Sequence, residues 1–135
     1  MRKILFLLVT LLSLTLASCG GSAASPNIDV TLTDFAFTPN QFTVPAGQEI
    51  TLKVQNNGAV VHNFIIMKLG TSAGEAFDAE DEGNVFWSER DIPPGSDLNV
   101  TFTAPTEPGD YQVVCKTQGH IASGMIATVT VVANK

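Results

Sequence analysis

The sequence is poor in basic side chains. Its 135 residues include seven Lys and Arg against thirteen Asp and Glu, and two of the basic residues, Arg2 and Lys3, directly precede an apolar run over residues 4–16. A basic head followed by such a run is typical of a signal peptide, and the run is too short to span a membrane comfortably. Removal of residues 1–18 leaves five basic residues against thirteen acidic ones, a formal charge near −8. This charge argues against nucleic acid or an anionic lipid surface as the partner.

Cysteine is also scarce, and its two copies have different contexts. Cys19 ends the segment Leu-Ala-Ser-Cys, which resembles the bacterial lipobox, where the Cys becomes the lipidated first residue of the mature protein. Ordinary cleavage nearby, with Cys19 discarded, is the alternative. Residues 19–27 are rich in Gly, Ser and Ala and predict a flexible tether. We therefore expect a signal peptide at 1–18, a lipidated tether at 19–27, and a domain at 28–135 anchored in the bacterial cell envelope, outside the cytoplasm.

The sequence also lacks a strong helical stretch and an internal repeat. Apolar and polar residues alternate over 28–33, 49–55 and 97–103, which predicts half-buried strands. Residues 60–67 are apolar on both faces except at His62 and Asn63, as expected of a central strand. Gly- and Pro-rich turns separate these segments. A single all-β domain, an antiparallel β-sandwich, is therefore the predicted fold.

One segment, residues 70–84, interrupts this rhythm. It is acidic and has Gly near both ends, and we expect a surface excursion with a short helical turn around residues 75–79. Its carboxylates could steer a basic partner, or they could serve only to keep the protein soluble. The sequence leaves these two interpretations open.

Histidine occurs only twice, at His62 and His120. If Cys19 is acylated, Cys115 is the remaining free thiol of an exported protein, which is an oxidation liability unless it has a function. The C-terminal part contains Cys115, His120 and Met125 in a Cys-x4-His-x4-Met arrangement. One thiolate, two imidazoles and a weak thioether form the ligand set of blue copper sites. Taken singly, each residue is more often a core or loop residue, but their joint order and spacing favour a metal site.

The expected strand pattern brings these donors together. Cys115 has the same strand parity as Val113, and Met125 has the same parity as Ala127, so both sulfur atoms should point into the sandwich. The loop between them would place His120 over the same point, and His62 would arrive from the central strand. Structural zinc sites close with four N, S or carboxylate donors, whereas thiolate with thioether suits copper. We therefore predict one mononuclear copper ion, cycling between Cu(I) and Cu(II).

On these residues the chain resembles the plastocyanin/azurin family of cupredoxins, and its Cys-x4-His-x4-Met loop is most similar to that of auracyanin-like blue copper lipoproteins. The segments that carry the resemblance are Phe-Thr-Val-Pro-Ala-Gly at 42–47, Val-His-Asn-Phe at 61–64, and the stretch 109–115. The resemblance implies a Greek-key sandwich and a supporting role for Asn63, whose counterpart hydrogen-bonds near the Cys sulfur.

The function that follows is the transport of single electrons between redox partners, such as cytochromes or membrane complexes, by a monomer. His120 should then lie at an exposed edge, with Ile121 and Ala122 helping to form an apolar docking rim. Extracytoplasmic copper binding and delivery is the alternative. An enzyme with Cys115 as nucleophile is disfavoured, because no orienting third group or oxyanion hole is evident.

Overall fold

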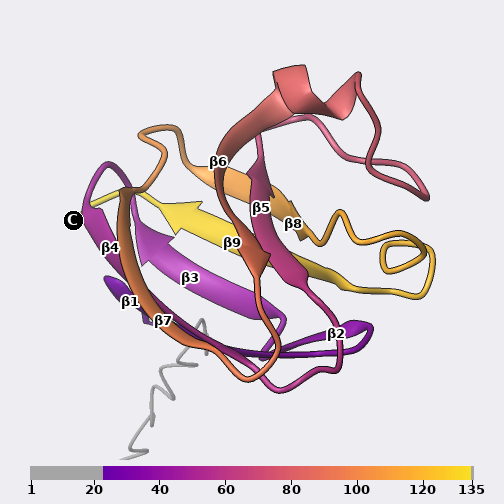
Figure 1. The fold of residues 1–135 in the computed structure, drawn as a ribbon. Coiled ribbons are helices and arrows are strands. Elements are labelled where there is room, and N and C mark those ends of the chain that lie inside the picture. Colours follow the sequence, from indigo (N-terminus) through magenta and orange to yellow (C-terminus); the bar gives the residue numbers. More distant parts are fainter. Residues whose placement is uncertain (1–22, 135) are drawn as a thin grey trace, which may run out of the picture.

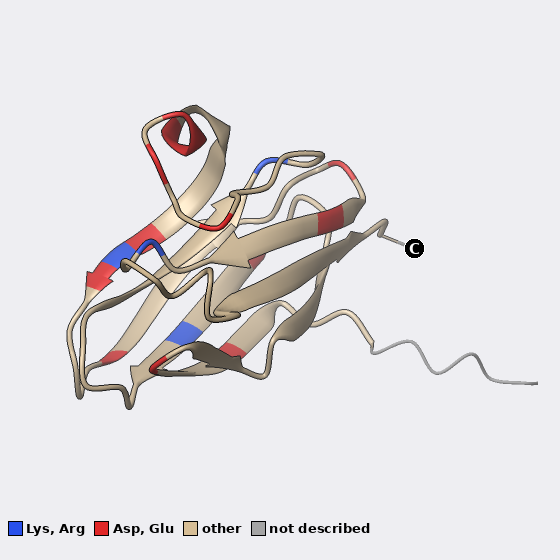
Figure 2. Ribbon diagram, turned by 90° about the vertical axis from the view of Figure 1, so that its right-hand side faces the viewer, with Lys and Arg blue, Asp and Glu red and all other residues tan. Residues whose placement is uncertain are grey.

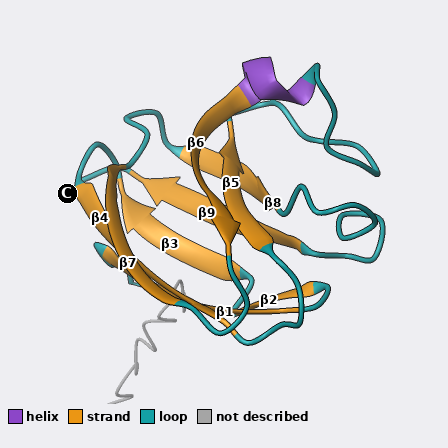
Figure 3. Cartoon of the chain, in the orientation of Figure 1, coloured by secondary structure: helices purple, strands orange, loops and turns teal. Residues whose placement is uncertain are grey.

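The computed structural model describes residues 23–134, which form two β-sheets packed face to face (Figure 1). The first sheet has the strand order β2-β1-β4-β7, with β1 at Asn27–Thr33, β2 at Ala36–Thr38, β4 at Glu49–Asn56 and β7 at Asp97–Thr103. The second sheet has the order β3-β9-β8-β5-β6, with β3 at Gln41–Pro45, β9 at Ile126–Val132, β8 at Gly109–Val114, β5 at His62–Met67 and β6 at Val85–Ile92. Within the described residues the only helical segment is the 3-10 turn η1 at Asp81–Asn84 (Figure 3).

The predicted all-β sandwich is confirmed, and most strand pairs are antiparallel. Two pairs are parallel, however: β1 with β4, and β3 with β9. The reason lies in the chain path, because the chain leaves the first sheet after β2, forms β3 in the second sheet, and returns to the first sheet as β4. Such crossovers bring strands side by side in the same direction, which local alternation of residues does not reveal.

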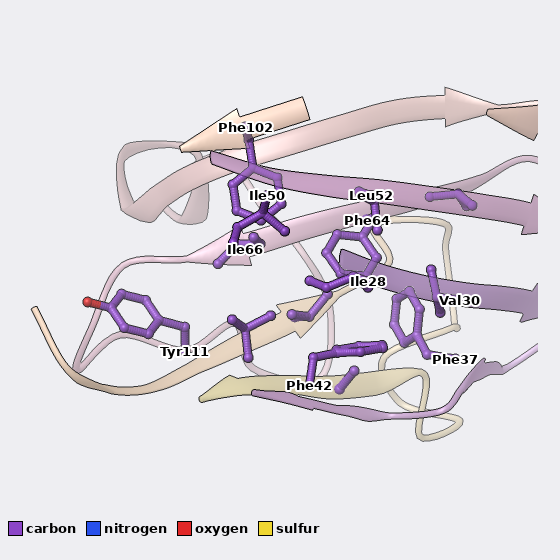
Figure 4. Close-up of a cluster of buried hydrophobic side chains, with 14 of the residues drawn as sticks. Ile28, Val30, Phe37, Phe42, Ile50, Leu52, Phe64, Ile66, Phe102 and Tyr111 are labelled. Carbon is purple, nitrogen blue, oxygen red and sulfur yellow. The ribbon is translucent and has the colours of Figure 1, made fainter. Parts of the chain in front are cut away.

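The core lies between the two sheets and follows from the alternation of apolar residues. In β1 and β4 every second side chain is buried against the opposite sheet, and Phe64 of β5 packs edge-on against Phe37 at a centroid distance of 5.7 Å (Figure 4). All six residues of β5 are buried, because both faces of the strand are covered. Phe64 faces the main core, while Ile65 belongs to a second apolar cluster with Met67, Ala73, Val114 and Ile121. The prediction of a central strand over residues 60–67 is thus confirmed, with the strand itself beginning at His62.

The N-terminal boundary of the fold lies slightly earlier than predicted. β1 begins at Asn27 rather than residue 28, the Ser25 amide donates to the Thr43 carbonyl at 2.9 Å, and the Thr51 amide donates to the Pro26 carbonyl at 2.8 Å. The last residues of the predicted tether are therefore hydrogen-bonded to the sandwich. The predicted signal peptide and Cys19 lie outside the described residues. Among residues 23–134 no helix is long and apolar enough to cross a membrane.

The acidic segment differs from the prediction. The helical turn occupies Asp81–Asn84 and not residues 75–79, because the buried Asp81 carboxylate accepts a hydrogen bond from the Asp78 amide at 3.0 Å. Glu82 forms two hydrogen bonds of 2.8 Å with Arg90 of β6, and these lower the pKa of the Glu82 carboxyl. Acidic residues gather at η1 and on the segment before it (Figure 2). The carboxylates of Asp81 and Glu82 are therefore engaged in hydrogen bonds within the domain.

Candidate metal centre

The loop between β8 and β9 carries three of the four predicted ligands. Cys115 follows the last residue of β8 and Met125 precedes the first residue of β9, and both side chains are fully buried in the main core with Val113 and Ala127. Both sulfur atoms therefore lie inside the sandwich, as strand parity predicts. The loop lies at the right-hand end of the sandwich in Figure 1, opposite the C-terminus.

Hydrogen bonds within this loop fix its shape. The His120 amide donates to the Thr117 carbonyl at 3.0 Å, and the Met125 amide donates back to the His120 carbonyl at 2.9 Å. Gly119 and Gly124 flank the His120 turn with φ of 81° and 93°, a left-handed conformation that favours glycine. The backbone thus holds His120 and Met125 in fixed positions relative to Cys115.

His62 enters from the first residue of β5 and completes the cluster. Its Nδ1 lies 3.7 Å from Cys115 Sγ, and His120 Nδ1 lies at the same distance from that sulfur. The Met125 Sδ atom is 3.3 Å from His120 Nδ1. The two imidazole rings are 5.0 Å apart and tilted by 50°. The structure therefore brings together all four of the side chains that the sequence predicts as ligands.

The electrostatics of the cluster favour metal binding. Burial lowers the pKa of both His62 and His120. The nearby His120 ring lowers the pKa of His62 further. The Asp34 carboxylate acts in the opposite direction on the pKa of both histidines. An imidazole with a lowered pKa remains neutral at lower pH, so its lone pair is available to a metal. Protons compete less well for these two nitrogens than for those of a solvated histidine.

Asn63, predicted as a supporting residue, contacts the cysteine sulfur. Its Nδ2 lies 3.8 Å from Cys115 Sγ and 3.4 Å from Thr117 Oγ1, while its Oδ1 accepts a hydrogen bond from the Asp91 amide at 3.1 Å. The Thr117 hydroxyl donates to the Val61 carbonyl at 2.7 Å and lies 3.4 Å from the same sulfur. The sequence did not indicate Thr117, because a single hydroxyl in a loop carries no spacing signal.

The predicted docking rim requires a correction. His120 is only 4% exposed and Ile121 only 5%, because Ile121 packs into the second apolar cluster against β5 and β8. Ala122 is exposed. Phe35, from the turn between β1 and β2, lies edge-on against the His120 ring at a centroid distance of 5.0 Å and is 50% exposed. The solvent-exposed apolar side chain beside this histidine is therefore Phe35 and not Ile121.

Sequence reasoning also missed Asp34, whose carboxylate Oδ1 lies 3.3 Å from His62 Nε2. Asp34 and Phe35 are consecutive residues of one tight turn, and Phe35 adopts a left-handed φ of 71°. The turn joins β1 to β2 in the first sheet, while the four predicted ligands belong to the second sheet and its loop. Because this contact crosses between sheets, no local sequence signal could have indicated it.

The donor chemistry fits copper. The nitrogen and sulfur atoms of His62, Cys115 and His120 lie within 4.8 Å of one another, a spread that one ion bound at about 2.0–2.3 Å to each can bridge. Two imidazoles and a thiolate with a thioether beside them form the His₂Cys plus Met set of type 1 copper. The predicted single type 1 copper site is thus confirmed in its donor set.

Comparison with known proteins gives the same result. A family model described as a cupredoxin-like domain matches residues 3–129. Auracyanin-A of Chloroflexus aurantiacus is 31% identical and covers 89% of this chain and 91% of its own. Plastocyanin of Sambucus nigra is 35% identical over 71% of this chain and 87% of its own. The dithionite-reduced auracyanin of Roseiflexus castenholzii, 30% identical, superposes with a TM-score of 0.68 over 82% of this chain and 99% of its own. With this fold and donor set, the chain belongs to the cupredoxin family.

Proposed function

We propose that the protein is a blue copper electron carrier, with His62, Cys115, His120 and Met125 holding one copper ion. The observation that carries the proposal is that four buried donor atoms converge on one point: two imidazole nitrogens, a cysteine sulfur and a methionine sulfur. Imidazole suits both oxidation states of copper and thiolate with thioether suits Cu(I), so the bound ion supplies one-electron chemistry. Four protein donors leave no coordination position for a substrate, and the protein is therefore a carrier and not an enzyme.

Burial of the donors favours electron transfer over copper delivery. A delivery protein must release its ion to a partner, which requires at least one donor to be accessible or mobile. Here Cys115, His62 and Met125 are fully buried, and His120 sits in a turn closed by its own backbone hydrogen bonds. A rigid, enclosed donor set retains the ion and needs little rearrangement when the oxidation state changes.

The partner-facing surface of the proposed carrier lies over the histidines. Phe35, Val60 and Val61 are exposed apolar side chains on the two loops that adjoin His120 and His62. An apolar patch of this kind suits brief contact with a redox protein, since it excludes water without requiring charge pairing. Electrons would then pass through Phe35 and the His120 edge, which are in direct contact.

Voltammetry with Met125 variants tests the carrier proposal. The copper-loaded protein should give one reversible one-electron wave, whereas loss of copper on reduction would support delivery instead. Met125→Leu should raise the reduction potential, because losing a donor destabilises Cu(II) relative to Cu(I); a tenfold change in that preference is about 59 mV. Met125→Gln should lower the potential, since an amide oxygen is a harder donor. Identical potentials in all three proteins would remove Met125 from the coordination sphere.

We propose further that the domain is anchored in the bacterial envelope through a lipid on Cys19. The support is the lipobox-like segment before Cys19 and the small-residue tether after it. A carrier on a slack tether reaches membrane-bound redox partners without diffusing away.

The anchor is tested by fractionation of the full chain expressed with its own leader. The wild-type protein should sediment with membranes, and its mature mass should correspond to a chain that starts at Cys19 with added lipid. Cys19→Ala should release the protein or leave it unprocessed. A mature chain that starts at any other residue would refute the anchor and leave the copper site unaffected.

A further inference from the structure

The ring of His62 has a second nitrogen that the metal site does not use. Its Nδ1 faces Cys115 Sγ, while Nε2 points away from the cluster and is fully buried. Nε2 has no well-aligned hydrogen bond among the described residues, and the Asp34 carboxylate lies beside it with Oδ1 at 3.3 Å. A buried ring nitrogen without a hydrogen-bond partner destabilises the fold, and Asp34 offers an acceptor for it.

The Asp34 carboxylate is held in place for this contact. The Ala59 amide donates to its two oxygens at 3.1 and 3.3 Å. Gly58 packs closely against this contact, because a Cβ atom there would collide with His62 Nε2 and would lie 2.6 Å from Asp34 Oδ1. The loop between β4 and β5 therefore closes over the Asp34–His62 pair only because residue 58 has no side chain.

The β4–β5 loop is also held by hydrogen bonds to the buried residue Asn56. Asn56 accepts a hydrogen bond from the Gly58 amide at 2.9 Å through its Oδ1. Its Nδ2 donates to the carbonyls of Val60 at 3.0 Å and Ile92 at 2.9 Å. Two of these three side-chain hydrogen bonds hold the short segment that covers Asp34 and His62, and the third ties it to β6.

We propose that Asp34 is a positioning residue that orients His62 and sets the redox balance of the site. By accepting a hydrogen bond from Nε2–H, the carboxylate fixes the tautomer in which Nδ1 is free to bind the metal. Its negative charge also stabilises the more highly charged Cu(II) state relative to Cu(I). The inference rests on the proposed copper function and adds to it a residue from the opposite sheet.

A simpler role for Asp34 is to cap the β4–β5 loop through the Ala59 amide. The two roles differ in what Asp34→Asn does. The amide keeps an oxygen that can accept one hydrogen bond, so a purely capping role survives the change, whereas the charge beside His62 is lost. Asp34→Ala removes both the charge and the acceptor.

The experiment compares the copper-loaded full domain carrying Asp34→Asn, Asp34→Ala or Asp29→Asn. Asp29 is a matched control on the adjoining strand β1, where its exposed carboxylate lies 3.8 Å from Lys53 Nζ. Both Asp34 variants should shift the Cu(II)/Cu(I) equilibrium at least about tenfold toward Cu(I), or about 59 mV upward in potential. The control should shift it far less, because its charge is solvated and already paired.

A second readout is nuclear magnetic resonance of the Cu(I) protein, which is diamagnetic. Wild type should show a slowly exchanging His62 Nε2–H signal, which Asp34→Ala should broaden or remove. Potentials in both Asp34 variants equal to that of Asp29→Asn, with the Nε2–H signal retained, would overturn the inference. In that case the blue colour would persist and the carrier proposal would stand; a wild-type protein without a blue centre would instead refute the carrier proposal itself.

Discussion

Replacing Cys115 with serine should abolish the visible colour of the oxidised, copper-loaded protein. The colour of a blue copper centre comes from charge transfer between a thiolate and Cu(II), and a hydroxyl cannot replace so soft a donor. Cys115 is the only described thiol, is fully buried, and lies within 3.7 Å of both imidazoles. The loss should be complete, because neither imidazole nor thioether can produce the same band.

The measurement is an absorption spectrum after copper addition and oxidation, together with circular dichroism to confirm the fold. Serine is close in size to cysteine, so the sandwich should remain intact. Cys19→Ser, which changes the other cysteine of the sequence, is the control for cysteine replacement and should keep the colour. A coloured Cys115→Ser protein would mean that this thiolate is not a ligand.

The second large effect is expected at a residue with no donor atom. Gly58→Ala places a Cβ in collision with His62 Nε2 and at 2.6 Å from Asp34 Oδ1, so one of the two side chains must move. His62 is enclosed on all sides and Asp34 is held by the Ala59 amide, so the shift should displace a copper ligand. We expect a destabilisation of about 1–3 kcal/mol, as for overpacked interiors, and a weakened blue band.

Urea denaturation of the apo protein and copper titration of the folded protein measure these two effects separately. Gly74→Ala is the matched control, since a Cβ at that position meets no atom within 4 Å and its φ is not in the left-handed region. The control should leave both measurements near their wild-type values. If Gly58→Ala behaves like Gly74→Ala, the β4–β5 loop is not packed on His62 as described.

The metal site was predictable because its chemistry depends on rare residues. Two histidines, one available thiol and a methionine at regular spacing leave few alternatives, and strand parity directs both sulfur atoms inward. Strands with clear alternation, such as β1, β4 and β7, were predicted within one residue of their ends. In these segments local pattern and tertiary packing demand the same arrangement.

What the sequence did not reveal depends on contacts between distant segments. Asp34 and Phe35 occupy an ordinary-looking turn, and they meet His62 and His120 only because the two sheets stack. The parallel pairs arise from the crossover of the chain through β3. Ile121 was expected at the surface but is buried by the second apolar cluster. Such arrangements follow from the three-dimensional path and carry no local periodicity.

The most direct test of the central claim is the absorption spectrum of the wild-type protein during a reductive titration. The protein is loaded with one equivalent of copper, oxidised, and then reduced stepwise in the absence of air. A type 1 copper centre should give an intense visible band that bleaches after one electron per copper and returns fully on reoxidation. A protein that takes up copper without such a band, or prefers zinc and yields no redox-active colour, would not be a blue copper carrier.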